Sequence, residues 1–340
     1  MDLSLSSEQR QLVDSFAALY AKESSPERVR AAEPSGFDSR LWKSLQDNGV
    51  VHMAVDEAAG GWGASELELA LIAEPYGGAV ASAPVIEAQV AARLLAQCGQ
   101  SGAEWLAKAL TADALVTFLP RRGTGSRLGL VPAAGVADAV VALVDERLLL
   151  VPLDHGNRRS IENLASMPLA DIEIRDDSAV LAEGAEALAL FGGALDLWLG
   201  LTGMALVGAA QKAVELGVDY AKQRHAFGTA IGTFQAVSHP LADSATAADG
   251  ARLLCLKAAC SFADDPDRTS ELAAMAFAFA YETARDATRR SLHIHGGYGF
   301  GMEQDIQLYY RRARGWAMVF GEPVAALDRV AEKRYGTVGN

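Results

Sequence analysis

Residues 224–235 read RHAFGTAIGTFQ and close a long helical pattern with a glycine-containing turn. An arginine at a helix end beside such a turn, here Arg224, can bind a phosphate through two parallel hydrogen bonds. Phe227 can pack against a flat aromatic ring, and the amide of Gln235 can recognise a polar edge. The segment therefore predicts a site for a ligand that carries both a phosphate and a ring. The alternative is an ordinary helix end followed by a loop.

A second glycine-rich segment, residues 293–300, reads HIHGGYGF. Gly296 and Gly297 lack side chains, so the backbone there can approach a ligand closely. The spacing of His293 and His295 could suit a metal, but no carboxylate or third histidine stands at ligand spacing, and we predict no metal site. No strand precedes the segment, which excludes a dinucleotide-binding fingerprint.

Composition excludes several classes of function. The chain has 340 residues and a net charge of -13, which argues against a nucleic-acid or anionic-membrane surface. Its 3 cysteines are too few for a disulfide framework. The polar N-terminus has no apolar signal core, and no apolar run is long enough for a membrane span. We therefore expect a cytoplasmic protein that binds neither nucleic acid nor membrane.

Three parts of the chain differ in composition and in the spacing of their apolar residues. Residues 1–112 are rich in Ala, Leu and Glu with helical periodicity, and residues 183–340 return to that pattern. Residues 113–182 instead hold short apolar runs bounded by Gly, Pro and Asp, which are typical of strands. Asp145 and Glu146 are predicted to form a tight turn between two of these strands. We predict an α+β fold with an N-terminal α-helical domain, a small central β-barrel-like domain and a C-terminal four-helix bundle.

Helical spacing marks individual helices. Apolar residues that step by three or four define one helix face in the third part: Val207, Ala210, Val214, Val218 and Ala221. Other helices are expected at residues 37–49, 66–76, 236–262, 271–293 and 324–334, and one begins at Glu8 with Ser6 or Ser7 as its cap.

Taken in order, these segments resemble the acyl-CoA dehydrogenases. The Arg-x-x-Phe-Gly-x-x-Ile-Gly-x-Phe-Gln stretch of that family is similar to residues 224–235 without a gap, and its second glycine motif is similar to residues 293–300. Residues 5–15, 37–49 and 56–63 also resemble the family. The resemblance covers nearly the whole chain and is weakest at the predicted strands.

The resemblance implies FAD held at a subunit interface. Arg224 would contact its pyrophosphate, and the adenine and ribityl side would lie against Phe227, Gln235 and a strip that runs from His293 through Gly296 and Gly297. It also implies α,β-desaturation of an acyl-CoA thioester, in which a carboxylate takes the α-proton and the flavin takes the β-hydride. Electrons would then pass to an electron-transfer flavoprotein.

The family places its catalytic carboxylate at one of two positions, and neither is acidic in this chain. One position matches Gly321, with Glu322 one residue late, and the other matches Trp198. One residue on a helix is a rotation of about 100°, so Glu322 need not face the same pocket. Glu322 is thus the acidic residue next to an expected base position. The predicted β domain also lacks the flavin-wrapping stretch of the family.

In these departures from the family pattern, the chain resembles the short subunits of heteromeric, α2β2-type bacterial acyl-CoA dehydrogenases. The resemblance implies a heterotetramer in which a dissimilar partner subunit supplies the base, and by association a bulky steroid or other polycyclic CoA thioester. Three alternatives stay open. They are a self-sufficient homomeric dehydrogenase that uses Glu322, a scaffold subunit that binds no flavin, and a flavin-dependent monooxygenase on the same fold.

Overall fold

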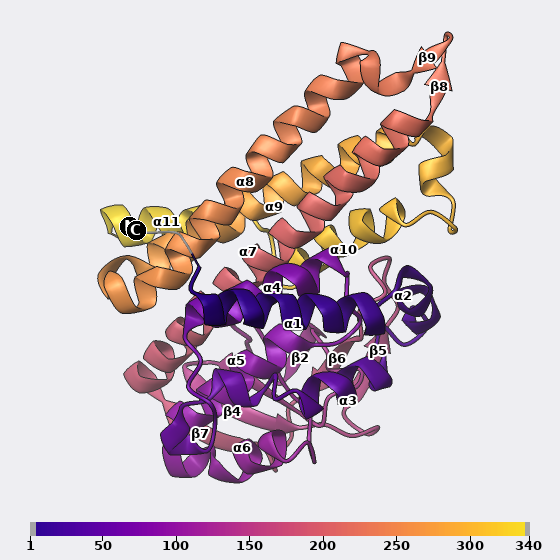
Figure 1. Ribbon diagram of the computed structural model, residues 1–340. Coiled ribbons are helices and arrows are strands. Elements are labelled where there is room, and N and C mark those ends of the chain that lie inside the picture. Colours follow the sequence, from indigo (N-terminus) through magenta and orange to yellow (C-terminus); the bar gives the residue numbers. More distant parts are fainter. Residues whose placement is uncertain (1–4, 337–340) are drawn as a thin grey trace.

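The first part of the chain is helical, and in Figure 1 it shares the lower half of the view with the strands, below the long helices α7, α8 and α9. The computed structural model describes residues 5–336. The helices of this part are α1 (Ser7–Glu23), α2 (Pro26–Ala32), α3 (Ser39–Asp47), α4 (Glu66–Gly78), α5 (Val85–Gln97) and α6 (Ala103–Leu110), with short 3-10 turns η1 (His52–Ala54), η2 (Glu57–Ala59) and η3 (Gly99–Ser101).

Side-chain caps fix where these helices begin. The hydroxyl of Ser6 accepts a hydrogen bond from the backbone N–H of Gln9, whose side chain accepts one from the N–H of Ser6. This capping box shows that Ser6, one of the two predicted candidates, is the cap of α1, which begins at Ser7. In α3, Asp38 accepts from two backbone N–H groups and is itself the cap. The helix therefore begins after Phe37, and the predicted start at Phe37 is wrong.

Two small sheets follow, and they pack face to face. Their strands are β1 (Val116–Phe118), β2 (Arg127–Val131), β3 (Ala139–Val144), β4 (Arg147–Pro152), β5 (Arg158–Ile161), β6 (Leu169–Glu173) and β7 (Ala179–Glu183). One sheet has the order β1-β3-β4-β7 and the other β2-β6-β5. Only β1 and β3 pair in parallel among these strands; their neighbours are antiparallel. Alternate residues of both sheets, including Leu128, Val140 and Ile172, form a shared buried cluster.

The hairpin between β3 and β4 confirms the predicted tight turn. Asp145 and Glu146 both have positive φ, at 47° and 64°. Two successive left-handed residues make a type I′ turn, whose twist matches that of the flanking strands, and Asp is one of the residues that tolerates this backbone.

The C-terminal half is built on α7 (Gly184–Gln223), which packs against α4, α5, α8 and α9. The remaining helices are α8 (Gln235–Asp264), α9 (Thr269–Ile294), α10 (Ile306–Met318) and α11 (Ala325–Tyr335), with the turns η4 (Ile231–Thr233), η5 (Pro266–Arg268) and η6 (Gly296–Phe300). α7 is long and apolar enough to span a membrane, but 83% of its most apolar window is buried inside the protein. Its role as the central core helix accounts for that composition. The sequence of helices, strands and helices confirms the predicted α+β fold.

Helices α4 and α7 touch backbone to backbone. A Cβ atom added at Gly208 would lie 1.9 Å from the carbonyl oxygen of Glu74, and one added at Gly77 would lie 1.8 Å from the carbonyl oxygen of Ala205. Any side chain at either position would hold the two helices apart. This contact joins the N-terminal helices to the C-terminal bundle that carries the candidate site.

The turn after α7 differs from the prediction. Residues 225–230 form a two-stranded hairpin of β8 (His225–Ala226) and β9 (Thr229–Ala230) rather than a plain loop. Phe227 and Gly228, at φ 54° and 81°, make its turn. Glycine adopts this conformation freely, whereas Phe227 does so at some cost in strain. Figure 1 shows the hairpin at the end of the α7–α8 pair farthest from the strands.

Candidate functional site

Arg224 caps the C-terminal end of α7, where the chain turns into the β8–β9 hairpin. Its backbone N–H donates to the carbonyl of Tyr220 at 2.8 Å, and its own carbonyl accepts from the N–H of Ile231 at 2.8 Å. These bonds fix the backbone on both sides of the turn. The Arg224 side chain is exposed and makes no hydrogen bond or ion pair within residues 5–336. The guanidinium group is therefore available to an anion.

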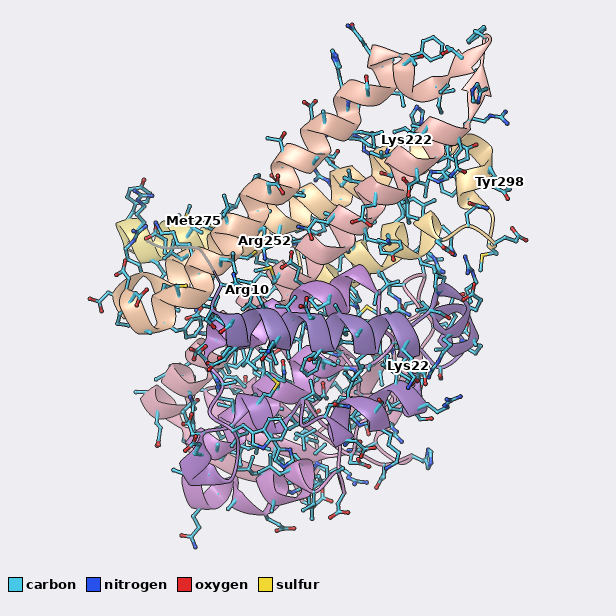
Figure 2. All side chains as sticks on the ribbon, viewed as in Figure 1. Arg10, Lys22, Lys222, Arg252, Met275 and Tyr298 are labelled. Carbon is cyan, nitrogen blue, oxygen red and sulfur yellow. The ribbon has the colours of Figure 1, made fainter. Side chains whose placement is uncertain are left out.

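A cavity of about 720 Å³ brings the two glycine-rich segments together. Arg224 and Ile231 line one side, and Gly296 and Gly297 of η6 line the other. A Cβ atom at either glycine would meet nothing within 4 Å, so their backbone opens onto free space. Figure 2 labels Lys222 and Tyr298 on the two elements that border this cavity. The geometry suits a ligand that presents a phosphate to Arg224 and a flat surface to the glycine backbone.

The floor of this cavity contains a ring pair that the sequence patterns did not single out. The rings of Tyr220 and His295 stack with centroids 4.2 Å apart. His295 is buried, and its Nδ1 lies 2.7 Å from the carbonyl oxygen of Ser291. The pair links the end of α7 to the end of α9 and so holds the two walls of the cavity in place. Its only sequence signal was the second histidine of the glycine-rich segment.

The other predicted contact residues lie outside this cavity on the neighbouring surface. Phe227 at the hairpin tip is 97% exposed and meets Phe234 edge to face, with centroids 6.2 Å apart. Gln235, at the first residue of α8, and His293, on the last turn of α9, are also exposed. The structure thus joins Arg224, Gly296 and Gly297 in one cavity. It leaves Phe227, Gln235 and His293 facing outward, where a ligand or a second subunit can reach them.

Of the two positions where the family carries its base, Trp198 lies inside the protein and Gly321 is exposed. Trp198 is fully buried in α7, and its ring stacks with that of Phe320, the neighbour of Gly321, at a centroid distance of 6.3 Å. Glu322 does not share this interior. It is exposed in the turn between α10 and α11, where its carbonyl accepts from the N–H of Ala325. We expected Glu322 to be rotated about 100° from Gly321 on a helix, but the chain is not helical at Glu322. The side chain is exposed because it lies in a turn.

Asp196, one of two acids close to Trp198, is already neutralised. It is 5% exposed, accepts from Arg329 of α11 at 2.5 Å and also bonds to the hydroxyl of Ser270. A carboxylate held by a cation and a hydroxyl is a structural tie between α7, α9 and α11. Both of its carboxylate oxygens are therefore engaged within the protein.

Glu87 of α5 is the second acid, and no motif pointed to it. Its Oε1 accepts a hydrogen bond from the indole Nε1 of Trp198 at 3.2 Å. It has no cation partner in the part of the chain that the structure describes. Burial raises the pKa of the Glu87 carboxyl group, and the indole hydrogen bond offsets part of that effect. The sequence showed only a single acid in an apolar run, which is a weak signal.

The raised pKa of Glu87 gives a prediction about stability. The carboxyl group of Glu87 binds its proton more tightly in the folded state than in the unfolded state. Its ionisation therefore lowers the free energy of unfolding as the pH rises above 4.5, the ordinary pKa of the group. Glu87→Gln keeps an oxygen that accepts from Trp198 and removes the charge. We expect the variant to gain stability over the parent chain as the pH rises, measured by urea unfolding between pH 4 and pH 8, roughly the range over which buried carboxyls titrate. A stability difference that is constant with pH would contradict the assignment.

Comparison with known proteins places the chain in a family. The model of the acyl-CoA dehydrogenase N-terminal domain matches residues 6–113, and that of the C-terminal domain matches residues 192–333. The chain is 31% identical to acyl-CoA dehydrogenase IpdE2 of Mycolicibacterium smegmatis over 95% of this chain and 98% of that protein.

Solved structures show the same fold. The crystal structure of the ChsE4–ChsE5 complex from Mycobacterium tuberculosis superposes with a TM-score of 0.89 at 23% identity, covering 100% of both chains. The Tcur3481–Tcur3483 steroid ACAD superposes with a TM-score of 0.85 at 26% identity, covering 96% of this chain and 97% of that one. This chain therefore belongs to the acyl-CoA dehydrogenase family, whose members use FAD.

Proposed function

We propose that this chain is one of two dissimilar subunits of a flavin-dependent acyl-CoA dehydrogenase. A single contrast carries the proposal. The Arg224–glycine cavity is open and its guanidinium is free, whereas both base positions, Trp198 and Gly321, lack a carboxylate. The similar ChsE4–ChsE5 and Tcur3481–Tcur3483 structures are each named for two proteins, which supports a second subunit.

The residues of this chain fit the nucleotide half of FAD. Arg224 would bind the pyrophosphate through paired N–H groups, and the bare backbone of Gly296 and Gly297 would let the nucleotide lie against η6. The exposed ring of Phe227 would pack on the adenine side, with Gln235 and His293 as polar contacts. When bound, FAD supplies the acceptor for the hydride that leaves the β-carbon.

Removal of the α-proton needs a carboxylate that lies close to the α-carbon in a dry pocket. In this chain Glu322 faces solvent, Asp196 is bound by Arg329, and Glu87 lies behind Trp198. The partner would therefore supply the base. The assembly would be a heterotetramer that acts on a bulky steroid or other polycyclic acyl-CoA and passes electrons to an electron-transfer flavoprotein in the cytoplasm.

Replacing Glu322 separates this proposal from a self-sufficient homomeric enzyme. With the partner present, we expect Glu322→Gln to leave kcat within about twofold, because an exposed acid in a turn cannot act as a buried base. The matched control is Glu332→Gln, an exposed acid on α11. A general base contributes about 10²- to 10⁴-fold, so a loss of that size in Glu322→Gln with flavin retained would support the homomeric enzyme instead.

A scaffold subunit that binds no flavin is the second candidate, because Trp198 fills the interior where chemistry would occur. The two candidate functions predict different flavin absorbance and a different effect of replacing Arg224 with alanine. A scaffold would leave its complex with full flavin content after Arg224→Ala, whereas the shared-site dehydrogenase would lose flavin.

A further inference from the structure

The wall of the Arg224 cavity that carries Gly296 and Gly297 receives little support from its own side chains. A Cβ atom added at either glycine would meet nothing within 4 Å. Phe300 of η6 is 66% exposed, and its ring meets that of Tyr310 of α10 edge to face, with centroids 6.3 Å apart. Burial of side chains therefore contributes little to the position of η6, and contacts of its backbone and of the segment after it must fix this wall.

One anchor of η6 is the end of α9. A Cβ atom at Gly299 would lie 2.7 Å from the carbonyl oxygen of Leu292 and 2.9 Å from the Cβ atom of His295. The backbone of Gly299 therefore packs directly on the last turn of α9. The stack of His295 on Tyr220 holds the same turn to α7. A second anchor is needed on the other side of η6, where the chain leads into α10.

Arg30 of α2 supplies that second anchor. Its Nε donates to the carbonyl oxygen of Met302 at 2.9 Å, and its Nη2 donates to the carbonyl oxygen of Glu303 at 2.8 Å and to Oδ1 of Asp305 at 2.5 Å. The Arg30 side chain is 24% exposed, so these bonds are largely shielded from water. In Figure 1, α2 lies below the yellow loop that leads into α10. One planar guanidinium group thus holds three consecutive parts of this loop.

Two tight turns connect the Arg30 contact to the glycine wall. The N–H of Gly301 donates to the carbonyl oxygen of Tyr298 at 2.9 Å, and the N–H of Gln304 donates to the carbonyl oxygen of Gly301 at 3.0 Å. Because the loop and the end of η6 are bonded to each other in this way, a displacement at the Arg30 contact would be transmitted to η6.

Helix α2 is itself fixed to the body of the protein. Ser25 caps the helix, and Val29 and Ala32 are buried. Glu33, directly after the helix, accepts a hydrogen bond from Arg311 of α10. Arg30 therefore projects from a base whose position does not depend on η6.

We infer that Arg30 is a positioning residue for the nucleotide half of FAD, because it holds the wall of Gly296 and Gly297 in place opposite Arg224. The inference rests on the proposed function and adds a residue of the N-terminal helices that lies outside the set lining the cavity. Flavin affinity then depends on the contact between α2 and residues 302–305, far from the cavity in sequence.

Flavin fluorescence titration of the assembled apo complex tests this role. Arg30→Ala is expected to lower the affinity for FAD about three- to thirtyfold, the range over which residues remote from a ligand modulate its binding. Arg30→Lys keeps a cation beside Asp305 but loses the planar group that reaches two carbonyls, so its affinity is expected to lie between those of Arg30→Ala and the parent. Amide hydrogen exchange of residues 296–305 is expected to be faster in Arg30→Ala than in the parent complex, with or without flavin.

Arg28→Ala is the matched control. Arg28 lies on the same helix, its side chain is also 24% exposed, and it donates to Glu23 and Asp38, which both belong to the N-terminal helical region. The control is expected to keep the parent affinity for FAD within about twofold and the parent exchange of residues 296–305, because its partners are independent of that segment. Thermal unfolding and co-elution with the partner identify the folded variants. If Arg30→Ala does not assemble, Arg30→Lys carries the comparison.

An affinity for FAD equal to that of the parent in folded Arg30→Ala would overturn the inference. An equal loss of affinity in Arg28→Ala would also overturn it, since that would mark a general effect of loosening α2. A parent complex that binds no flavin would instead contradict the proposed function. Hydrogen exchange would then decide on Arg30 alone, and unchanged exchange of residues 296–305 in Arg30→Ala would show that Arg30 does not position η6.

Discussion

Arg224→Ala is expected to lower the affinity of the assembled complex for FAD about ten- to hundredfold. A hydrogen bond to a charged group contributes about 1.5–3 kcal/mol, and each 1.4 kcal/mol is tenfold in affinity. Arg224 has no competing partner in the part of the chain that the structure describes, so its full contribution is available to the pyrophosphate. Flavin fluorescence titration of the apo complex measures the change.

Two further variants sharpen this result. Arg224→Lys keeps the charge but loses the paired N–H geometry, so its affinity is expected to fall between those of the parent and Arg224→Ala. Lys222→Ala removes a nearby exposed cation that does not line the Arg224 cavity, and it should leave flavin binding unchanged. Full flavin content in Arg224→Ala after gel filtration would remove Arg224 from the site.

Gly208→Ala is expected to destabilise the chain by about 3 kcal/mol or to prevent its folding. Overpacking usually costs about 1–3 kcal/mol, and this site lies at the upper end because the new methyl group meets a backbone carbonyl that cannot rotate away. The loss would appear in the midpoint of denaturant unfolding, and the α4–α7 contact would be its cause.

Gly200→Ala on the same helix is the control for Gly208→Ala. A Cβ atom there meets nothing within 4 Å, so the change relieves the entropy cost of a helical glycine and should be neutral or stabilising by about 0.5–1 kcal/mol. Equal stability of the two variants would show that the backbone contact between α4 and α7 does not hold these helices together.

Local signals explain why much of the fold could be predicted. The cap at Ser6 and the turn at Asp145 and Glu146 depend on residues within a few positions of each other, and both stand in the structure as expected. The β8–β9 hairpin was missed because Phe227 is an unusual residue for a left-handed turn position. α10 was also missed, although its buried residues step by three or four along the helix: Ile306, Tyr309, Ala313 and Trp316.

The candidate site could be predicted only in part from the sequence. Its motifs placed Arg224 beside glycine-rich backbone, but they gave no indication that Trp198 and Phe320 meet, because that contact joins positions far apart in the chain. The contact between Glu87 and Trp198 could not be predicted either, because these two residues are also far apart in the chain. Burial in the folded protein raises the pKa of this carboxyl group on α5. Such properties depend on tertiary packing, and no periodic pattern in the sequence indicates them.

We infer that this chain holds half of a flavin site and lacks the base. A comparison of the purified chain alone, its dissimilar partner alone and the two co-expressed tests this inference, with flavin absorbance and acyl-CoA turnover measured for each. We expect stoichiometric flavin and turnover only in the co-expressed complex. Stoichiometric FAD and turnover in this chain alone would contradict it.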